Sequence, residues 1–374
     1  MAKSLTTYIS KSGHSVSSAC TRFWRWLGRH WRRSLWQKIK IIGVCVVVFW
    51  FAAAYGIAQW YIHHENKPVA LGVSFIPAYA RYLGLDPQVT MDALLNDVHV
   101  KNFRLTSYWD IGEPSKGHYD FSELDWEFAK ADKAHAHIIL TIGLRQPRWP
   151  ECHPPSWVDT SQPWQQWYPA LKNYMAAVIN RYKDNPALAS YQLENEYFLK
   201  GFGHCQDMSR QRLVDEFNLV RSLDPHHQII IGRSNNALGW PVGAPTPDEF
   251  SISIYRRVWD ANATHRYLEY PFPAWYYAMV AGWQKMWTGK DMIIGELQAE
   301  PWIPPGKSIL TTSLAEQSKS FNAARLKDTI QFAKGTGMKG IYLWGAEYWY
   351  YRLTVLHDPS VWNTAKQEFN ASTH

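Results

Sequence analysis

Two glutamates stand directly after apolar runs, where a carboxyl group able to do chemistry can be held out of water. Glu196 closes the segment Gln-Leu-Glu-Asn-Glu, and Glu296 follows Ile-Ile-Gly. A buried carboxylate costs free energy unless it has a partner or a task. One such acid alone is most simply a salt-bridged or helix-capping residue, but two acids in one site can divide the roles of proton donor and nucleophile. The elements that position them therefore decide what they can do.

From residue 70 onward, short β-rich runs alternate with amphipathic stretches. The predicted strands are Leu71–Ile76, Phe103–Tyr108, His137–Ile142, Ala189–Glu194, Gln228–Arg233, Ser251–Tyr255, Met292–Leu297 and Gly340–Trp344. Apolar residues at helical spacing separate most of them, although the connection between the fifth and sixth strands is short and its helix is expected to be degraded. Eight strand–helix units predict an α/β fold, a (β/α)8 or TIM barrel. A doubly wound open sheet is the alternative, but no Gly-rich phosphate loop follows any strand.

The carboxyl ends of barrel strands meet at one face, where this architecture places its working groups. Glu196 follows the fourth predicted strand and Glu296 lies at the end of the seventh. These strands stand on opposite sides of a barrel mouth, so the two acids can face each other. Their common location favours a shared catalytic role over two separate structural ones.

The strand ends resemble those of the clan A glycoside hydrolases, the retaining (β/α)8 superfamily of cellulases, mannanases and β-galactosidases. Nearly all of residues 70–355 takes part in this resemblance, which does not select one family. An Asn-Glu pair ends strand four in the superfamily and a Glu ends strand seven, as do Asn195-Glu196 and Glu296 here. The other recurrent groups, an Arg, a Tyr and a Trp near the ends of strands two, six and eight, are matched by Arg104, Tyr255 and Trp344.

The resemblance implies a catalytic role for each acid. Glu196 would be the acid/base and Glu296 the nucleophile of a retaining cleavage, in which the two carboxyl groups lie about 5–5.5 Å apart. Glu196 must stay protonated near neutrality, whereas Glu296 must be ionised. Arg104 and Tyr255 would hold the nucleophile charged and aligned.

The resemblance also assigns residues to the sugar, and it leaves some assignments open. Asn195 would bond the sugar 2-hydroxyl, and Trp344 would form the floor of the subsite where the bond breaks. The Pro that often follows the Asn-Glu pair is Tyr197 here, a departure that weakens assignment to any familiar family. Glu194 and Glu300 are rivals for the two catalytic roles.

The predicted loops at the same barrel face carry aromatic residues and two cysteines. Trp109 and Trp302 are predicted to stack on pyranose faces, although packing against a neighbouring helix would explain each ring equally well. Further aromatic residues expected there are Trp149, Trp157, Tyr348 and Trp349. Cys152 and Cys205 follow strands three and four, so a disulfide between them would brace the rim, with two free thiols as the alternative.

The first 62 residues differ in composition from the rest. Nine of the 39 Lys and Arg lie in residues 1–40, which contain no acid, and residues 41–62 follow without a charge. The second segment is long enough to cross about 30 Å of hydrocarbon, so we expect an uncleaved transmembrane signal anchor. Because Lys and Arg are enriched on the cytoplasmic side of a membrane span, residues 1–40 are expected to lie in the cytoplasm. A linker, residues 63–69, and a glycoside hydrolase domain, residues 70–374, would then lie outside it.

Two alternatives remain for this N-terminal part. A cleaved signal peptide would use the small residues Ala52-Ala53-Ala54, but its basic region would be unusually long. The segment that holds Trp24, Trp26, Trp31 and Trp36 would form either an amphipathic helix on the inner membrane surface or a disordered basic tail.

Charge and composition exclude other classes of function. Beyond residue 40 the chain holds 30 basic and 32 acidic residues, so no net basic charge favours nucleic acid. No metal-ligand motif occurs in the sequence, and no metal or cofactor is predicted. The expected protein is a membrane-anchored retaining glycoside hydrolase acting on a β-linked saccharide. The alternatives are a transglycosylase that uses the same site and a non-catalytic polysaccharide-binding envelope protein.

Overall fold

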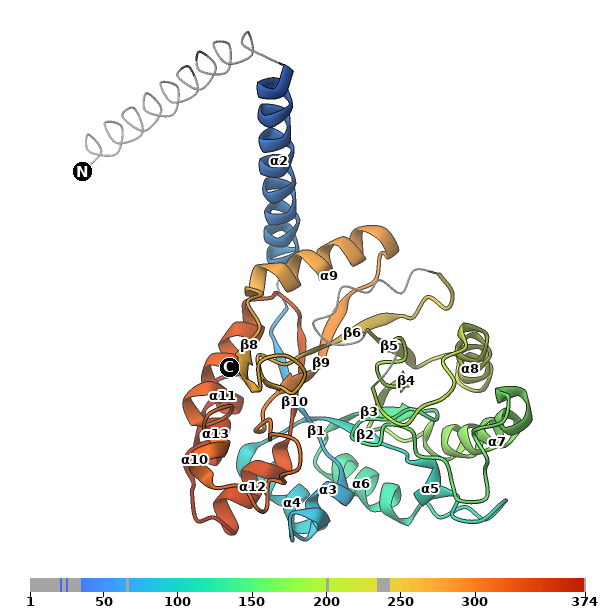
Figure 1. The fold of residues 1–374 in the computed structure, drawn as a ribbon. Coiled ribbons are helices and arrows are strands. Elements are labelled where there is room, and N and C mark those ends of the chain that lie inside the picture. Colours follow the sequence, from blue (N-terminus) through green and yellow to red (C-terminus); the bar gives the residue numbers. More distant parts are fainter. Residues whose placement is uncertain are drawn as a thin grey trace, which may run out of the picture. The chain divides into compact units, whose positions relative to one another are not determined.

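The computed structural model describes Thr21, Arg25 and residues 35–64, 67–199, 202–233 and 243–372. The chain divides into two compact units, Met1–Ile57 and Ala58–His374. The second unit is built on a closed barrel of eight parallel strands in the order β1-β10-β9-β6-β5-β4-β3-β2 (Figure 1). The predicted (β/α)8 barrel is therefore confirmed, and the open-sheet alternative is wrong.

The eight barrel strands follow the apolar runs of the sequence. They are β1 (Ala70–Ser74), β2 (Asn102–Thr106), β3 (His137–Ile142), β4 (Leu188–Leu193), β5 (Gln228–Arg233), β6 (Glu249–Ile254), β9 (Met292–Gln298) and β10 (Gly340–Trp344). Strands buried on both faces read as nearly continuous hydrophobic segments, which is why their predicted positions agree within about two residues. Pairing of Leu71 with Ile341 and of Val73 with Phe103 joins β1 to β10 and to β2, which closes the barrel.

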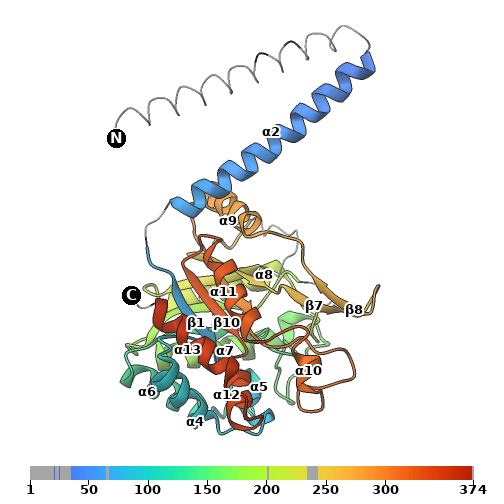
Figure 2. The ribbon, with the colours of Figure 1, turned by 90° about the vertical axis from the view of Figure 1, so that its left-hand side faces the viewer.

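Helices cover the outside of this barrel (Figures 1 and 2). They are α3 (Pro77–Tyr82), α4 (Pro87–Ala93), the π-helix η1 (Leu94–Val98), α5 (Trp109–Gly112), α6 (Ser122–Lys133), α7 (Trp164–Tyr182), α8 (Arg210–Leu223), α9 (Ala274–Thr288), α10 (Leu314–Gln317), α11 (Ala323–Lys334), α12 (Ala346–Thr354) and α13 (Ser360–Ser372). In α7 the buried residues Leu171, Met175 and Val178 recur at helical spacing and form the face that packs on the barrel. Between β5 and β6 the described residues 243–248 contain no helix, and the rest of this connection, where a degraded helix is predicted, lies outside the described residues.

The interior of the barrel changes from apolar to polar along the strands. Ile139, Ile230 and Ile293 form one apolar cluster, against which Tyr342 packs. Toward the carboxyl ends the inward side chains include Arg104 and other polar groups that bond to one another. Polar groups can be buried there because they have hydrogen-bond partners.

A two-stranded antiparallel hairpin, which was not predicted, follows β6. It consists of β7 (Arg257–Asp260) and β8 (Arg266–Glu269). The carboxylate of Asp260 shapes the turn by accepting hydrogen bonds from the backbone N–H groups of Asn262, Ala263 and Thr264. The two strands of the hairpin are short, charged and only partly buried, so they lack the apolar run that marks the barrel strands.

The apolar segment forms a single helix, α2 (Leu35–His63), long and apolar enough to cross a membrane. Its last residues belong to the barrel unit, where the Tyr61 hydroxyl donates to the carbonyl oxygen of Met292 at 3.4 Å. The side chain of His64 lies 3.3 Å from that of Asp291. The chain thus meets the barrel at the amino end of β9. Of the tryptophans of the predicted amphipathic segment, Trp24, Trp26 and Trp31 lie outside the described residues, and Trp36 lies in α2.

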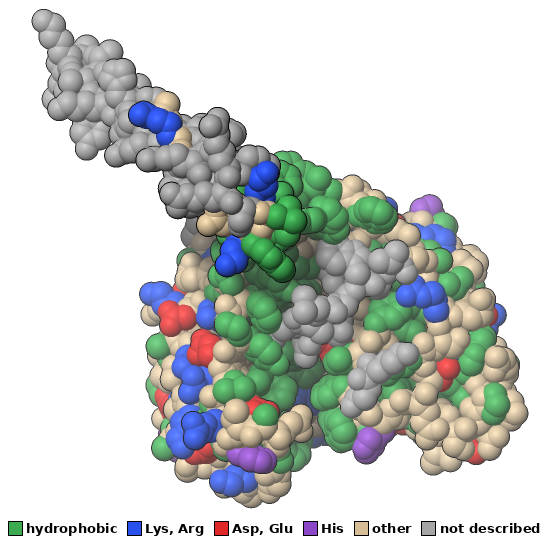
Figure 3. Space-filling model, turned by 45° about the horizontal axis from the view of Figure 1, so that its top comes forward, with side chains coloured by type: hydrophobic (Ala, Val, Ile, Leu, Met, Phe, Trp, Pro, Cys, Tyr) green, Lys and Arg blue, Asp and Glu red, His purple; other side chains and the backbone are tan. Residues whose placement is uncertain are grey.

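The surface of the described residues mixes both signs of charge. On the face drawn in Figure 3, Lys and Arg side chains alternate with Asp and Glu rather than gathering into one basic area. This mixture agrees with the balanced charge of the sequence beyond residue 40.

Candidate active site

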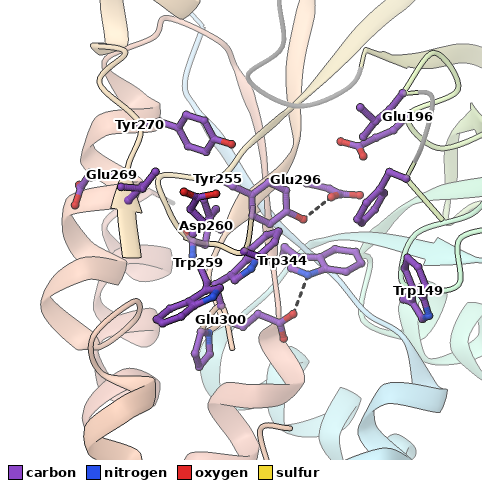
Figure 4. A pocket seen from close by; sticks show the side chains of 18 of the residues that line it. Trp149, Glu196, Tyr255, Trp259, Asp260, Glu269, Tyr270, Glu296, Glu300 and Trp344 are labelled. Carbon is purple, nitrogen blue, oxygen red and sulfur yellow. Dashed lines mark hydrogen bonds between the residues drawn. The ribbon is translucent and has the colours of Figure 1, made fainter. Parts of the chain in front are cut away.

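A cavity of about 580 Å³ opens at the carboxyl ends of the barrel strands. Glu196 and Glu296 both line it, together with Tyr255, Trp302 and Trp344 (Figure 4). The hairpin β7–β8 supplies part of the wall, including Trp259 and Leu268. The fold therefore brings most of the predicted site residues to one pocket.

Glu296 is held by two hydrogen-bond donors, one from β2 across the barrel and one from the end of the adjacent strand β6. It lies in β9, and its Oε1 accepts from Nη1 of Arg104 at 3.0 Å. Its Oε2 accepts from the hydroxyl of Tyr255 at 2.6 Å (Figure 4). Burial and the charge of Glu296 raise the pKa of Tyr255 well above its ordinary value, so the phenol stays protonated and keeps donating. Charge-assisted hydrogen bonds of this kind hold a carboxylate in a fixed position.

Arg104 connects the nucleophile candidate to the Asn-Glu pair. From β2 its Nη2 donates to Oδ1 of Asn195 at 2.8 Å, and its Nε donates to Oε1 of Gln192 at 2.7 Å. The guanidinium is 2% exposed, so these bonds act where water does not compete. One fork of donors therefore fixes the relative positions of Asn195 and Glu296.

Glu196 lies in a contrasting environment. Burial, followed by the charge of Glu296, raises its pKa to about 8, although a hydrogen bond from Ser253 opposes this shift. Its Oε1 is buried and has no hydrogen-bond partner among the described residues. A carboxyl group with this pKa is protonated at neutral pH and can donate its proton.

Several residues around the pocket adopt a left-handed backbone conformation that non-glycine residues rarely use. Glu194 and Glu196 have φ of 57° and 42°, and Arg148 and Glu151 have φ of 82° and 72°. Such conformations cost free energy and persist where the surrounding structure holds them. They turn the loops after β3 and β4 so that Arg148, Glu151 and Glu196 line the pocket.

Aromatic and charged groups form the rest of the floor and wall. The indole N–H of Trp344 donates to Oε1 of Glu300 at 2.9 Å, and the guanidinium of Arg148 lies 4.6 Å from the centre of its ring. Arg148 also lies 3.2 Å from Glu300. The ring of Trp302 meets that of Tyr255 edge to face at 5.5 Å. Glu300 thus orients Trp344 and pairs with Arg148.

Glu194, the rival for the acid role, is a structural residue. It is fully buried and lies 2.7 Å from Nη1 of Arg212, a residue of α8. Its carboxylate also accepts from the backbone N–H groups of Leu144 and Arg145 at 2.9 and 2.6 Å. It does not line the pocket, so its carboxylate ties β4 to the preceding loop and to α8.

The prediction that Trp109 binds substrate is wrong. Its side chain is fully buried, its indole N–H donates to Glu113 at 2.7 Å, and its ring stacks on Tyr174. Trp349 is likewise buried, with its N–H bonded to the carbonyl oxygen of Ala299. Both rings pack against neighbouring helices or loops. This is the alternative that was open for each aromatic residue near a strand end. Trp149, by contrast, is exposed and lines the pocket.

The sequence did not single out Glu151, a third carboxyl group in the pocket. Its Oε2 accepts from Nδ2 of Asn195 at 3.1 Å, and the nearest guanidinium atom, Nε of Arg145, lies 3.8 Å away. Burial and the charge of Glu296 raise its pKa to about 7. It belongs to the loop after β3 rather than to a strand, so no apolar run marks its position.

The sulfur atoms of Cys152 and Cys205 are bonded. The bond joins the loop after β3 to the loop after β4, the two loops that carry Glu151 and Glu196. Among the described residues no group of three or more His, Cys, Asp or Glu side chains is arranged to hold a metal ion.

Comparison with known proteins finds glycoside hydrolases that resemble part of this sequence and the fold of the barrel. The glycoside hydrolase family 42 model, described as "Beta-galactosidase", matches residues 91–223, which include Asn195 and Glu196. The GH5_18 protein from Bifidobacterium longum has the same fold, with a TM-score of 0.53 at 12% identity over 74% of this chain and 70% of its own. The resemblance to the clan A glycoside hydrolases is confirmed.

Other clan A-like structures match more loosely. Xylanase 10B from Thermotoga maritima gives a TM-score of 0.49 at 14% identity, over 84% of this chain and 98% of its own. A β-galactosidase from the haloarchaeon Halorubrum lacusprofundi gives 0.48 at 12% identity over 73% of this chain. The present chain spans about half, 52%, of the length of that haloarchaeal enzyme.

Proposed function

We propose that this chain is a retaining glycoside hydrolase that cleaves β-glycosidic bonds, with Glu296 as nucleophile and Glu196 as acid/base. The observation that carries the proposal is the contrast between the two carboxyl groups. Glu296 accepts hydrogen bonds from Arg104 and Tyr255, which hold it in one position. Glu196 faces the same cavity with a raised pKa and an oxygen free of hydrogen bonds among the described residues. This division is what double displacement requires.

In the first step, Glu296 attacks the anomeric carbon while Glu196 protonates the departing glycosidic oxygen, which leaves a glycosyl-enzyme. In the second step, Glu196 accepts a proton from water, and that water displaces Glu296. Asn195, held by Arg104, would bond the sugar 2-hydroxyl, an interaction that strengthens in the transition state. Trp344 and Trp302 would pack against the sugar.

Membrane anchoring is the second part of the proposal. Helix α2 has the length and composition of a membrane span, and nine basic residues without an acid precede residue 41. The rule that basic segments stay in the cytoplasm puts the barrel outside it. We therefore propose a single-pass protein that meets its saccharide outside the cytoplasm.

A panel of aryl β-glycosides, applied to the full chain in detergent, tests the catalytic part. We expect release of the chromogenic phenol from at least one glycoside, and its loss in Glu296→Gln. Chromatography of the products separates transfer to water from transfer to a second sugar. Saccharide binding without release of phenol from any glycoside would instead favour the non-catalytic alternative.

A further inference from the structure

The deep part of the pocket holds one more carboxyl group than the proposed reaction uses. Glu151, Glu196 and Glu296 all line the cavity and are 4%, 5% and 4% exposed. The reaction accounts for Glu196 and Glu296 only. Keeping a third buried acid next to them is unfavourable because like charges repel and burial penalises each charge.

Glu151 and Glu296 differ in the cations that lie near them. Glu296 has Arg104 at 3.0 Å, but Glu151 has only the more distant Nε of Arg145 at 3.8 Å. Among the described residues that line the pocket, the single Lys or Arg is Arg148, and it is paired with Glu300 at 3.2 Å. Glu151 therefore has no cation within hydrogen-bond distance before any ligand enters.

An independent observation points to a donor on the ligand. Oε1 of Glu196 is more than nine-tenths buried and aims into the same cavity, yet no described residue donates to it. A buried acceptor without a donor is rare in a folded protein and costs free energy until a ligand or water fills the place. Glu151 thus lacks a directly bonded cation and Oε1 of Glu196 lacks a hydrogen-bond partner, and an ammonium group on a ligand would supply both.

The position of Glu151 indicates which part of a sugar would carry that group. Its Oε2 is bonded to Nδ2 of Asn195 at 3.1 Å. Under the proposed function, on which this step rests, Asn195 contacts the substituent at C2 of the ring that is cleaved. Glu151 then lies beside that substituent.

We propose that the pocket takes a β-linked 2-amino-2-deoxy sugar with a free, protonated amine, and that Glu151 is the carboxylate that binds the ammonium group. A neutral 2-hydroxyl would satisfy fewer acceptors and bring no charge. A 2-acetamido group would bring bulk and no charge. The chemical class of substrate is thus a saccharide with de-N-acetylated amino sugars.

The test compares matched substrates on the full chain in detergent at pH 7, where Glu151 is partly ionised before the amine binds. Aryl β-glycosides with 2-amino, 2-hydroxyl and 2-acetamido groups, in gluco and galacto configuration, give kcat/KM for each. We expect the 2-amino compound of one configuration to be preferred at least about tenfold over its partners, as for other charge-assisted hydrogen bonds. In Glu151→Gln, which keeps an acceptor oxygen for Asn195 but loses the charge, the amino-to-hydroxyl ratio should fall about tenfold.

Glu269→Gln is the matched control. Glu269 also lines the pocket, but it lies within 3.4 Å of the guanidinium groups of Arg256, Arg257 and Arg325. Its removal should leave the amino-to-hydroxyl ratio unchanged. An equal fall in both variants would overturn the assignment of the ammonium site to Glu151. So would a wild-type ratio near one, or a ratio that Glu151→Gln does not change.

Calorimetric binding of a glucosamine tetramer and of cellotetraose separates this inference from the proposed function. If no glycoside is cleaved but the glucosamine tetramer binds at least about tenfold more tightly and loses that advantage in Glu151→Gln, the amine site stands and the hydrolase proposal fails. If glycosides are cleaved and neither assay shows a preference for the amine, the hydrolase stands and the amine site is wrong.

Discussion

At the scale of single residues, Glu196 and Glu296 are distinguished by what surrounds them rather than by type. Changing either to Ala should lower turnover of unactivated substrates by at least about 100-fold. On a substrate with a good leaving group, however, Glu196→Ala should still form the glycosyl-enzyme because Glu296 can attack without help. Added azide should then replace water and release a β-glycosyl azide, the retained product, which NMR identifies.

The configuration of the azide product and a third variant are the controls. An α-glycosyl azide from Glu196→Ala would mean one inversion instead of two and would rule out retention. Azide rescue of Glu194→Ala would move the acid role to that residue. We expect none, because Glu194 is bonded to Arg212 outside the pocket.

The pH dependence of the reaction follows from the pKa of Glu196. Because only the protonated acid can donate to the leaving oxygen, activity is present below this pKa and is lost as the pH rises through it. With the pKa raised to about 8, kcat/KM for an unactivated glycoside should stay high at pH 7 and fall above pH 8. A pH–rate profile measures this limb, and a fall centred near pH 4 to 5 would show an unshifted glutamate instead.

At the scale of elements, a buried ionic cluster joins β4 to α8. Arg212 lies 2.7 Å from Glu194 and also pairs with Glu216, and all three side chains are fully buried. Removing the cation leaves two uncompensated carboxylates, so Arg212→Ala should lower the free energy of unfolding by about 3–5 kcal/mol. Denaturant unfolding in detergent measures the loss.

The control for this cluster is an exposed ion pair of similar geometry. Arg181 lies 2.6 Å from Asp125, but both side chains are largely solvated. Arg181→Ala should cost less than about 1 kcal/mol, since water screens the pair. Equal losses in the two arginine variants would argue against a special role for the buried cluster.

The disulfide provides a second prediction at this scale. Cys152 and Cys205 are 53 residues apart, and closing such a loop restricts the unfolded chain. Cys152→Ser should therefore lower the free energy of unfolding by about 2–4 kcal/mol. Cys45→Ser is the control, because Cys45 is free and exposed in α2, and its unfolding should match that of the wild type.

The elements also explain which features the sequence could predict. Barrel strands such as β3 and β9 are apolar runs because both faces are buried, so their residues mark them. The predicted carboxyl ends of β4 and β9 then indicated where Glu196 and Glu296 lie in the barrel. The hairpin β7–β8 lacks such a run and was missed.

Site residues on loops were less accessible to sequence analysis than those on strands. Glu151 enters the pocket through a left-handed backbone turn after β3, which spacing cannot reveal. Trp109 was misplaced for a related reason. A tryptophan near a strand end has the same type whether it faces the pocket or, as here, the core.

At the scale of the whole molecule, the basic segment and the apolar helix predict on which side of a membrane the barrel lies. Protease added to intact cells should digest the barrel domain, because the basic segment that is predicted to be cytoplasmic precedes α2 and the barrel follows it. Immunoblotting against the C-terminal part measures this digestion. If the barrel is digested only after the cells are opened, it lies on the cytoplasmic side and the predicted topology is wrong.

The bond between Cys152 and Cys205 also bears on when the site is completed. Cys152 directly follows Glu151, and the bond ties it to the loop after β4. Thiols stay reduced in the cytosol and pair in oxidising compartments. A newly synthesised chain therefore holds these two loops by noncovalent contacts alone, and we expect it to act poorly on the cell's internal glycosides. Export would then serve as a maturation step, so that the enzyme reaches full activity only after it has left the compartment that made it.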